Sequence, residues 1–267
     1  MRRNLFLVAL SVLTGAQGCS SPESPVVEIH YLGHASFLMA FPGGPAVLTD
    51  YGESDAWGLD SPVYPLGEVR PDVVTRSHDH LDHAGGTLPE GIPNLLLGDR
   101  AFDTDGLTVS PIPTFEGPLS EPDNHSFLFE FDGLRILHLG DCQGLMVALG
   151  EAASSPRVRG EMEDRIRTLY PDRYDLVLLP IGFTRDILME AAEFVALLDA
   201  GQVIPMHYWN PLDRDAFLGL LEGGSDARGR PYRTVPLPGP RWILDGNVPE
   251  GEVVVVGLVP GPPGSRP

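Results

Sequence analysis

Three histidines and the aspartate Asp82 form an HxHxDH run within the heptapeptide Ser77-His78-Asp79-His80-Leu81-Asp82-His83, just after the short apolar run 72–75. Imidazole and carboxylate groups are costly to bury without partners, and neither helical nor strand periodicity places these four on one apolar face. A divalent metal ion supplies the missing partner, because Zn²⁺ accepts imidazole nitrogen and carboxylate oxygen as ligands. The pattern therefore predicts a metal centre on a loop at a strand end, with room for two ions. The alternative is a solvated histidine-rich loop.

This HxHxDH run resembles the first-half signature of the metallo-β-lactamase superfamily. Further motifs occur in the order seen in its ascorbate-phosphate-lactonase-like hydrolases: LGHASFL at 32–38, LTD at 48–50, HLGD at 138–141 and IPMHY at 204–208. The likeness covers roughly residues 26–210, which is more specific than any single motif. It implies an α/β fold (α+β, four-layer): an αββα sandwich of two mixed sheets with outer helices.

The resemblance also implies a set of metal ligands. His78 and His80 would bind a first ion, and Asp82 and His83 a second. The family pattern adds a bridging carboxylate and a last ligand of the second ion, here Asp141 and His207. Without the resemblance these two would be an ordinary turn aspartate and a capped strand end. The expected cofactor is Zn²⁺, two ions per chain, with iron or manganese as alternatives.

The third ligand of the first ion is where the sequence departs from the family. Relatives carry His-Asp where this chain has Phe115-Glu116-Gly117. Glu116 is the expected substitute, because two histidines and a glutamate form an accepted catalytic zinc set. His125 is the rival, and a one-metal centre with an incomplete first site is the third alternative.

Three more residues are expected near the centre. Asp50 is predicted to accept a hydrogen bond from a metal-bound imidazole, since ligating histidines need an outer acceptor. His34 is predicted to contact the ligands or the substrate, with a structural role as the alternative, and His138 to lie in the outer shell. We assign catalytic roles to Asp82 and His34.

The resulting prediction is a metal-dependent hydrolase that uses a metal-activated hydroxide on a phosphoester, a lactone or a related small molecule. No GxSxG or HExxH motif is present, which excludes the common serine hydrolase and zincin classes. Two alternatives remain: a redox-type iron enzyme of the same superfamily, and a non-catalytic metal-binding envelope protein.

Charge limits the partners. The 267 residues include 37 acidic side chains and 18 cationic ones, all arginine, for a net charge of −19. Such an acidic surface argues against nucleic acid or anionic lipid as a partner, and the lack of lysine excludes Schiff-base chemistry. A small-molecule substrate is expected; the oligomeric state stays open.

The N-terminus predicts export from a bacterium, to the periplasm or to a lipid anchor in the envelope. Residues 1–18 read as a signal peptide, with an arginine pair, a short apolar run and a small-residue exit. The arginine pair leaves general and twin-arginine export open. Cys19, followed by a polar tether at 19–25, resembles a lipidated cysteine and would be the only membrane attachment. The mass of the mature N-terminus would distinguish these forms.

One hydrolase domain is predicted over 26–256, followed by a disordered Pro/Gly tail at 257–267. Helices are expected at 144–152, 157–169, 184–198 and 213–221. The third has apolar residues on one face, Thr184 as a cap and Gly201 as a stop signal. Short β-runs fill most of the remainder. Asp132-Gly133 predicts a hairpin with a type I′ turn.

Overall fold

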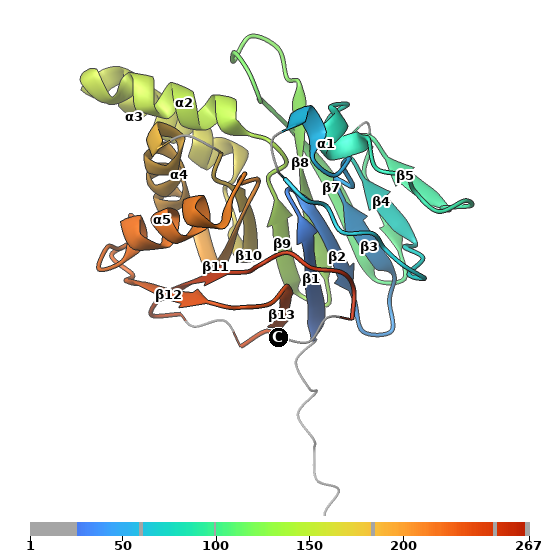
Figure 1. The fold of residues 1–267 in the computed structure, drawn as a ribbon. Helices are drawn as coiled ribbons and strands as arrows, with labels where there is room; N and C mark the ends of the chain where they lie inside the picture. Colours follow the sequence, from blue (N-terminus) through green and yellow to red (C-terminus); the bar gives the residue numbers. More distant parts are fainter. Residues whose placement is uncertain (1–25, 59–60, 99, 183–184, 248–249, 265–267) are drawn as a thin grey trace, which may run out of the picture.

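The computed structural model describes residues 26–58, 61–98, 100–182, 185–247 and 250–264. The predicted signal peptide, the tether with Cys19, and the cap at Thr184 lie outside these ranges. The described residues form two sheets packed face to face, with helices stacked against one of them (Figure 1). None of the helices in these ranges is long and apolar enough to cross a membrane.

The first sheet has six strands and carries the histidine run at its parallel end. Its order is β13 (Arg241–Leu244), β1 (Val27–Gly33), β2 (Ser36–Ala40), β3 (Ala46–Thr49), β4 (Val73–Thr75) and β5 (Asn94–Leu96). The pairs from β13 to β3 are antiparallel, and β3, β4 and β5 run parallel. The sheet is therefore mixed, as predicted.

The second sheet has eight strands. Its order is β12 (Tyr232–Pro236), β14 (Val253–Gly257), β11 (Asp199–Met206), β10 (Arg173–Pro180), β9 (Leu134–His138), β8 (Asn124–Phe131), β7 (Leu107–Thr114) and β6 (Phe102–Thr104). The half from β12 to β9 is parallel and the half from β9 to β6 is antiparallel. The central parallel strands β10, β11 and β14 are largely apolar and buried because both of their faces are covered, whereas the edge strand β12 is partly exposed.

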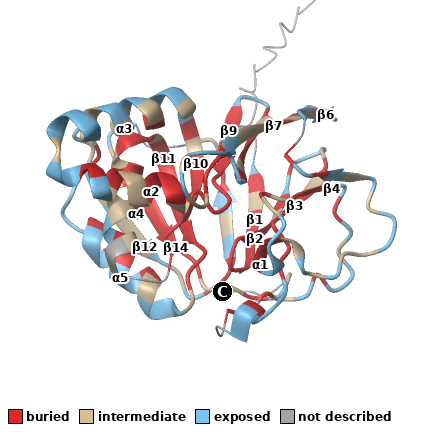
Figure 2. Ribbon diagram, turned by 90° about the horizontal axis from the view of Figure 1, so that it is seen from above, coloured by how far each residue is buried: buried red, intermediate tan, exposed pale blue. Residues whose placement is uncertain are grey.

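The longer helices cover the outer face of this second sheet (Figures 1 and 2). They are α2 (Gln143–Glu151), α3 (Pro156–Leu169), α4 (Arg185–Leu197) and α5 (Pro211–Leu221). Two short turns, η1 (Ala56–Gly58) and η2 (Ala152–Ser154), and the one-turn helix α1 (Leu81–Ala84) complete the described helical elements. The predicted sandwich of two mixed sheets with helices is confirmed.

The outer face of the first sheet is covered differently. Strand alternation sends Leu32, Leu48 and Val74 to this face, where they pack against Val63 and Leu66 in a small cluster of their own. The covering chain is formed by the largely irregular segments 50–58 and 61–71 rather than by a long helix. The opposite face joins the main core between the sheets, where the rings of Tyr31 and Phe37 stack at a centroid distance of 4.7 Å.

The structure differs from the sequence-based expectations in three places. Gly201 does not stop a helix: α4 ends at Leu197, and Asp199 already pairs with β10, so Gly201 lies inside β11. The described part of the expected disordered tail is ordered instead: Gly257 ends β14, and the Gly261 amide donates to the Tyr31 carbonyl of β1 at 3.1 Å. Strands β6 and β12 have no counterpart in the prediction, because edge pairing supplies what their weak alternation does not.

Candidate metal centre

The predicted ligands come from separate loops at one edge of the two sheets. The loop after β4 carries His78 and His80, and α1 follows with Asp82 and His83 in its single turn. The other members follow β7, β9 and β11 or lie in the β1–β2 turn: Glu116, Asp141, His207 and His34. Rigid strands thus deliver side chains that are far apart in the sequence to one place.

Strained backbone is concentrated at this edge. His34, Asp50 and His207 have φ values of 52°, 37° and 58°. Non-glycine residues rarely adopt this left-handed region, and they persist there only when the surrounding structure enforces it. Gly140, at φ 61°, precedes Asp141, and a β-carbon there would lie 2.5 Å from Cβ of Ser77. Only glycine allows β9 to end this close to the histidine loop.

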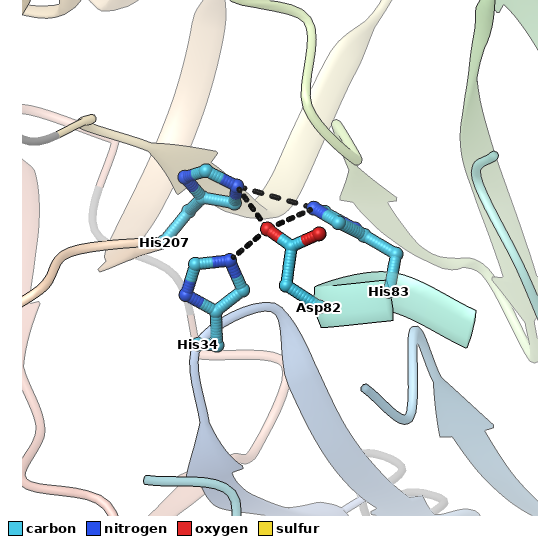
Figure 3. A group of neighbouring side chains, drawn as sticks. All are labelled: His34, Asp82, His83 and His207. Atoms are coloured by element: carbon cyan, nitrogen blue, oxygen red, sulfur yellow. Dashed lines mark hydrogen bonds and ion pairs between the residues drawn. The ribbon is translucent and has the colours of Figure 1, made fainter. Parts of the chain in front are cut away.

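A first group joins three imidazoles around one buried carboxylate (Figure 3). His34 Nε2 donates to Asp82 Oδ2 at 2.9 Å. Nε2 of His83 and Nε2 of His207 each lie 3.7 Å from the same oxygen. These two nitrogens are 3.1 Å apart, a distance at which two lone pairs would repel without a proton or a cation between them.

A second group lies beside the first. Glu116 places one carboxylate oxygen 3.4 Å from His78 Nε2 and the other 3.3 Å from His80 Nδ1. Asp141 lies between the groups: Oδ2 is 3.5 Å from His207 Nε2, and the residue also clusters with His78 and His83. Both groups combine imidazole and carboxylate, the donor set of catalytic zinc sites.

Unpartnered buried atoms are a further sign that these side chains suit metal ions. Among the described residues, the buried atoms His78 Nε2, Asp82 Oδ1 and Asp141 Oδ1 have no hydrogen-bond partner. Buried polar atoms are nearly always partnered, so three such atoms in one centre need an explanation. Cations would supply partners for His78 Nε2 and Asp141 Oδ1, and the attacking water would supply one for Asp82 Oδ1, since Asp82 Oδ2 is the oxygen nearer to His83 and His207.

Asp50 orients His83. Ser77 donates its amide and its hydroxyl to the Asp50 carboxylate, each at 2.7 Å, and the carboxylate accepts from His83 Nδ1 at 2.8 Å. Burial alone would lower the pKa of His83, but the Asp50 carboxylate raises it to about 9. Burial would raise the pKa of Asp50, but the hydrogen bond to His83 and the charge of that ring outweigh it. The pKa of Asp50 therefore falls to about 2. The pair holds His83 Nε2 toward the centre, which is the arrangement that aligns a metal-binding imidazole.

Burial sets the charge of the remaining groups. It lowers the pKa of His78 to about 3 and also lowers those of His34 and His207, so these imidazoles are neutral at pH 7, the form that binds metal. Burial raises the pKa of Asp141 to about 7, and the nearby Glu116 adds to the effect. A carboxylate held at such a cost is one that a bound cation would stabilise.

The two rivals for the third ligand lie in different places. Glu116 faces His78 and His80, and its backbone amide donates to the Asp123 carboxylate at 2.7 Å. His125 Nδ1 donates to the Ser77 carbonyl at 3.3 Å, and its ring lines a separate cavity of about 370 Å³. Among the described residues only Glu116 joins a ligand group with His78 and His80.

His138 contacts backbone atoms rather than a ligand side chain. Its Nε2 donates to the Ala35 carbonyl at 2.9 Å, and its Nδ1 accepts from the Gly140 amide at 3.1 Å. One neutral tautomer satisfies both bonds. His138 therefore ties together the turn after His34 and the turn before Asp141, an indirect support of the centre.

This arrangement predicts an acid-labile contribution to stability. Burial lowers the pKa of His138 below its ordinary 6.5. The unfolded chain therefore binds the proton first, and the free energy of unfolding falls as the pH drops below about 6.5, with no effect above it. We expect the change in urea midpoint between about pH 7.5 and pH 5.5 to be smaller in His138→Gln than in the wild type. Equal changes in both proteins would contradict this role.

Four residues of the centre were missed in the sequence analysis. Ser61 donates its hydroxyl to His34 Nδ1 at 3.1 Å, and the Gln143 amide lies 3.3 Å from His207 Nδ1. Asp123 positions Glu116, and Ser77 positions Asp50. Polar loop residues of this kind follow no sequence spacing from which their role could be predicted. Only Ser77, which is adjacent to the histidine run, could have been predicted to lie near the centre.

The two groups open into a cavity of about 410 Å³. Its lining combines ligand candidates with an amide and two indoles: Trp57, His80, Asp82, Glu116, Asp141, Gln143, His207 and Trp209. The volume lies within the range of small-molecule sites. Both ligand groups can therefore be reached by a small molecule from solvent.

Comparisons with known proteins agree with this geometry. Residues 28–155 match the β-lactamase superfamily domain, Lactamase_B_3. A UPF0173 metal-dependent hydrolase of Pelotomaculum thermopropionicum is 30% identical over 75% of this chain and 94% of its own length. The corresponding protein of Methanobrevibacter smithii is 28% identical over 71% of this chain and 85% of its own.

A solved structure shares the fold. A proposed Zn-dependent hydrolase of the metallo-β-lactamase superfamily from Thermotoga maritima superposes with a TM-score of 0.53 and 26% identity, over 87% of this chain and all of that one. The resemblance inferred from the motifs is thus confirmed at the level of a metallohydrolase of this fold. The chain belongs to the UPF0173 metal-dependent hydrolases, enzymes of the metallo-β-lactamase fold.

Proposed function

We propose that this hydrolase holds two zinc ions and cleaves a phosphoester, a lactone or a related small ester. The observation that carries the proposal is the pair of adjoining ligand groups with three unpartnered buried donor atoms, open to one cavity. His78, His80 and Glu116 would hold one ion, Asp82, His83 and His207 the other, and Asp141 lies between them. Bound zinc supplies Lewis acidity, which lowers the pKa of water and polarises the scissile oxygen.

Asp82 is the proposed proton acceptor. Its Oδ2 accepts a hydrogen bond from His34 Nε2, and Ser61 holds the other nitrogen of that ring, so His34 is fixed as the tautomer that donates to Asp82. Asp82 Oδ1 has no hydrogen-bond partner among the described residues and is free to take a proton from the attacking water.

The bond changes of ester cleavage then balance. The oxygen of water joins the acyl or phosphoryl atom, and the bond from that atom to the ester oxygen breaks. The departing oxygen takes the proton held at Asp82 and leaves as an alcohol. His34 keeps Asp82 oriented through both steps, which is the catalytic role expected for this pair.

Metal removal and reloading test the proposal. The protein stripped with a chelator is expected to be inactive on a panel of one phosphodiester and one lactone, and zinc should restore activity as the metal content rises to two ions per chain. Elemental analysis and initial rates on the same samples measure both. A zinc content below one ion per chain after reconstitution would overturn the dinuclear centre. Two bound ions without hydrolysis of either substrate would overturn the substrate class.

A further inference from the structure

Two tryptophans stand on the walls of the cavity that holds the ligand groups. Trp57 and Trp209 both line it, and Trp57 exposes 61% of its surface. Indole is a large apolar group that soluble proteins usually cover. An exposed one at the mouth of a functional cavity indicates a contact surface for a ligand.

The loop that carries Trp57 is held in a costly conformation. Trp57 and Asp55 have φ values of 61° and 56°, in the left-handed region. The Asp55 amide donates to the Ser61 carbonyl and the Gly58 amide donates to the Asp55 carbonyl, both at 2.9 Å. Backbone strain of this kind persists where the surroundings enforce it and is concentrated at functional sites.

The same loop is connected to the ligand groups. Ser61, whose carbonyl holds the Trp57 turn, donates its hydroxyl to His34 Nδ1. Trp209 forms a fixed wall, because its ring lies 5.0 Å from the ring of His34 and 6.0 Å from that of His207. The cavity thus has one packed and one exposed indole beside the ligand candidates.

The charged side chains that line the cavity indicate which class of ligand it can bind. The ionisable residues that line this cavity are His80, Asp82, Glu116, Asp141 and His207, and no arginine of the described chain lines it. The protein has no lysine. Anionic phosphate groups are commonly held by arginine forks, which this cavity does not offer.

We propose that the site takes neutral carboxylic esters, lactones included, that carry an aromatic ring, and that Trp57 and Trp209 hold this ring while the ester group faces the ligand groups. This rests on the proposed hydrolytic function and specifies its substrate class. Both walls are flat π-surfaces, which favour stacked or edge-on aromatic partners.

Hydrolysis of a matched ester pair tests the proposal. Methyl hydrocinnamate and methyl butyrate share the leaving group and differ in having a phenyl ring or a methyl group at the end of the acyl chain. The zinc-loaded enzyme should prefer the aromatic ester, and Trp57→Ala should lower the ratio of the two kcat/KM values about tenfold or more, since aromatic contact and ring burial are both lost. Trp57→Phe should restore most of the ratio. Leu220→Ala, an exposed apolar residue of α5, is the matched control and should leave the ratio unchanged.

A binding measurement separates this inference from the proposed function. Benzylacetone and methyl propyl ketone are neutral ketones that correspond to the two esters without the alkoxy oxygen, and they cannot be hydrolysed. Titration calorimetry should show tighter binding of benzylacetone to the zinc-loaded wild type, and about tenfold weaker binding to Trp57→Ala. Selective binding without hydrolysis of either ester, or of the phosphodiester and the lactone used in the metal-reloading experiment, would support the aromatic site and overturn the hydrolytic function. If both esters are hydrolysed and the ratio of their kcat/KM values is the same in the wild type and in Trp57→Ala, the aromatic site is overturned and the hydrolytic function stands. Faster cleavage of a phosphodiester than of either ester would overturn the substrate class.

Discussion

Replacing Asp141 by asparagine is expected to abolish hydrolysis, with a loss of at least about a thousandfold in kcat/KM, or ~4 kcal/mol. Its carboxylate lies between the two ligand groups, 3.5 Å from His207 Nε2, so the change removes negative charge that both ions would share. Elemental analysis should show fewer than two ions per chain.

The same change should have opposite effects on stability with and without metal. Burial raises the pKa of Asp141 to about 7 from 3.8. In the metal-free protein the unfolded chain therefore loses its proton first, and the free energy of unfolding falls as the pH rises from about 4 through 7. Asparagine does not titrate, so Asp141→Asn does not lose this stability. Without metal it should therefore have a higher melting temperature than the metal-free wild type at about pH 8. With zinc bound the order should reverse, because metal binding contributes to folding.

Asp132→Asn is the matched control for this experiment. Asp132 is an exposed aspartate of the β8–β9 turn, with a φ of 47°, a conformation that asparagine also tolerates. Its metal content and its rates should match those of the wild type, and so should its melting temperature both with and without zinc. Retention of two ions and of activity by Asp141→Asn would show that the carboxylate does not serve both groups.

Replacing Glu116 by alanine is the second change with a large expected effect. The variant should lose the ion held by His78 and His80 and keep the one on Asp82, His83 and His207, because Glu116 approaches only the first two at 3.4 Å and 3.3 Å. We expect about one ion per chain and a loss of activity on the order of a hundredfold or more. Elemental analysis and initial rates on zinc-loaded protein measure both.

Glu116→His separates charge from ligand count. This variant should keep two ions, with one negative charge fewer at the site. The attacking water then becomes more acidic, so the acidic limb of the pH–rate profile should shift to lower pH. An unchanged acidic limb together with two ions would mean that Glu116 does not influence the reacting water.

His125→Ala is the control for both Glu116 variants and should keep two ions, since its ring lines a different cavity. Loss of an ion in His125→Ala with retention of both in Glu116→Ala would transfer the assignment to His125. Unchanged metal content in both would leave an incomplete first site and a one-metal centre.

Much of the fold and of the ligand set could be predicted from the sequence because it depends on local chemistry. The spacing of the histidine run places four donors within six residues, which no packing arrangement other than a metal centre satisfies easily. The hairpin turn at Asp132-Gly133 was predicted as type I′, and the structure has φ values of 47° and 85° there. The helices α2, α3 and α5 begin and end within two residues of their predicted bounds.

Other features depend on which distant segments meet. The choice between Glu116 and His125 cannot be read from spacing. Glu116 follows β7 and His125 lies at the start of β8, and only the tertiary structure decides which of them faces His78. The tail after Gly257 has the composition of a disordered segment, yet its backbone finds donors and acceptors on β1. Trp57 and Ser61 reach the centre through a loop without periodicity. Local sequence determines the chemistry and the repeating elements, whereas long-range pairing selects among loops that are locally equivalent, and only the tertiary structure contains that information.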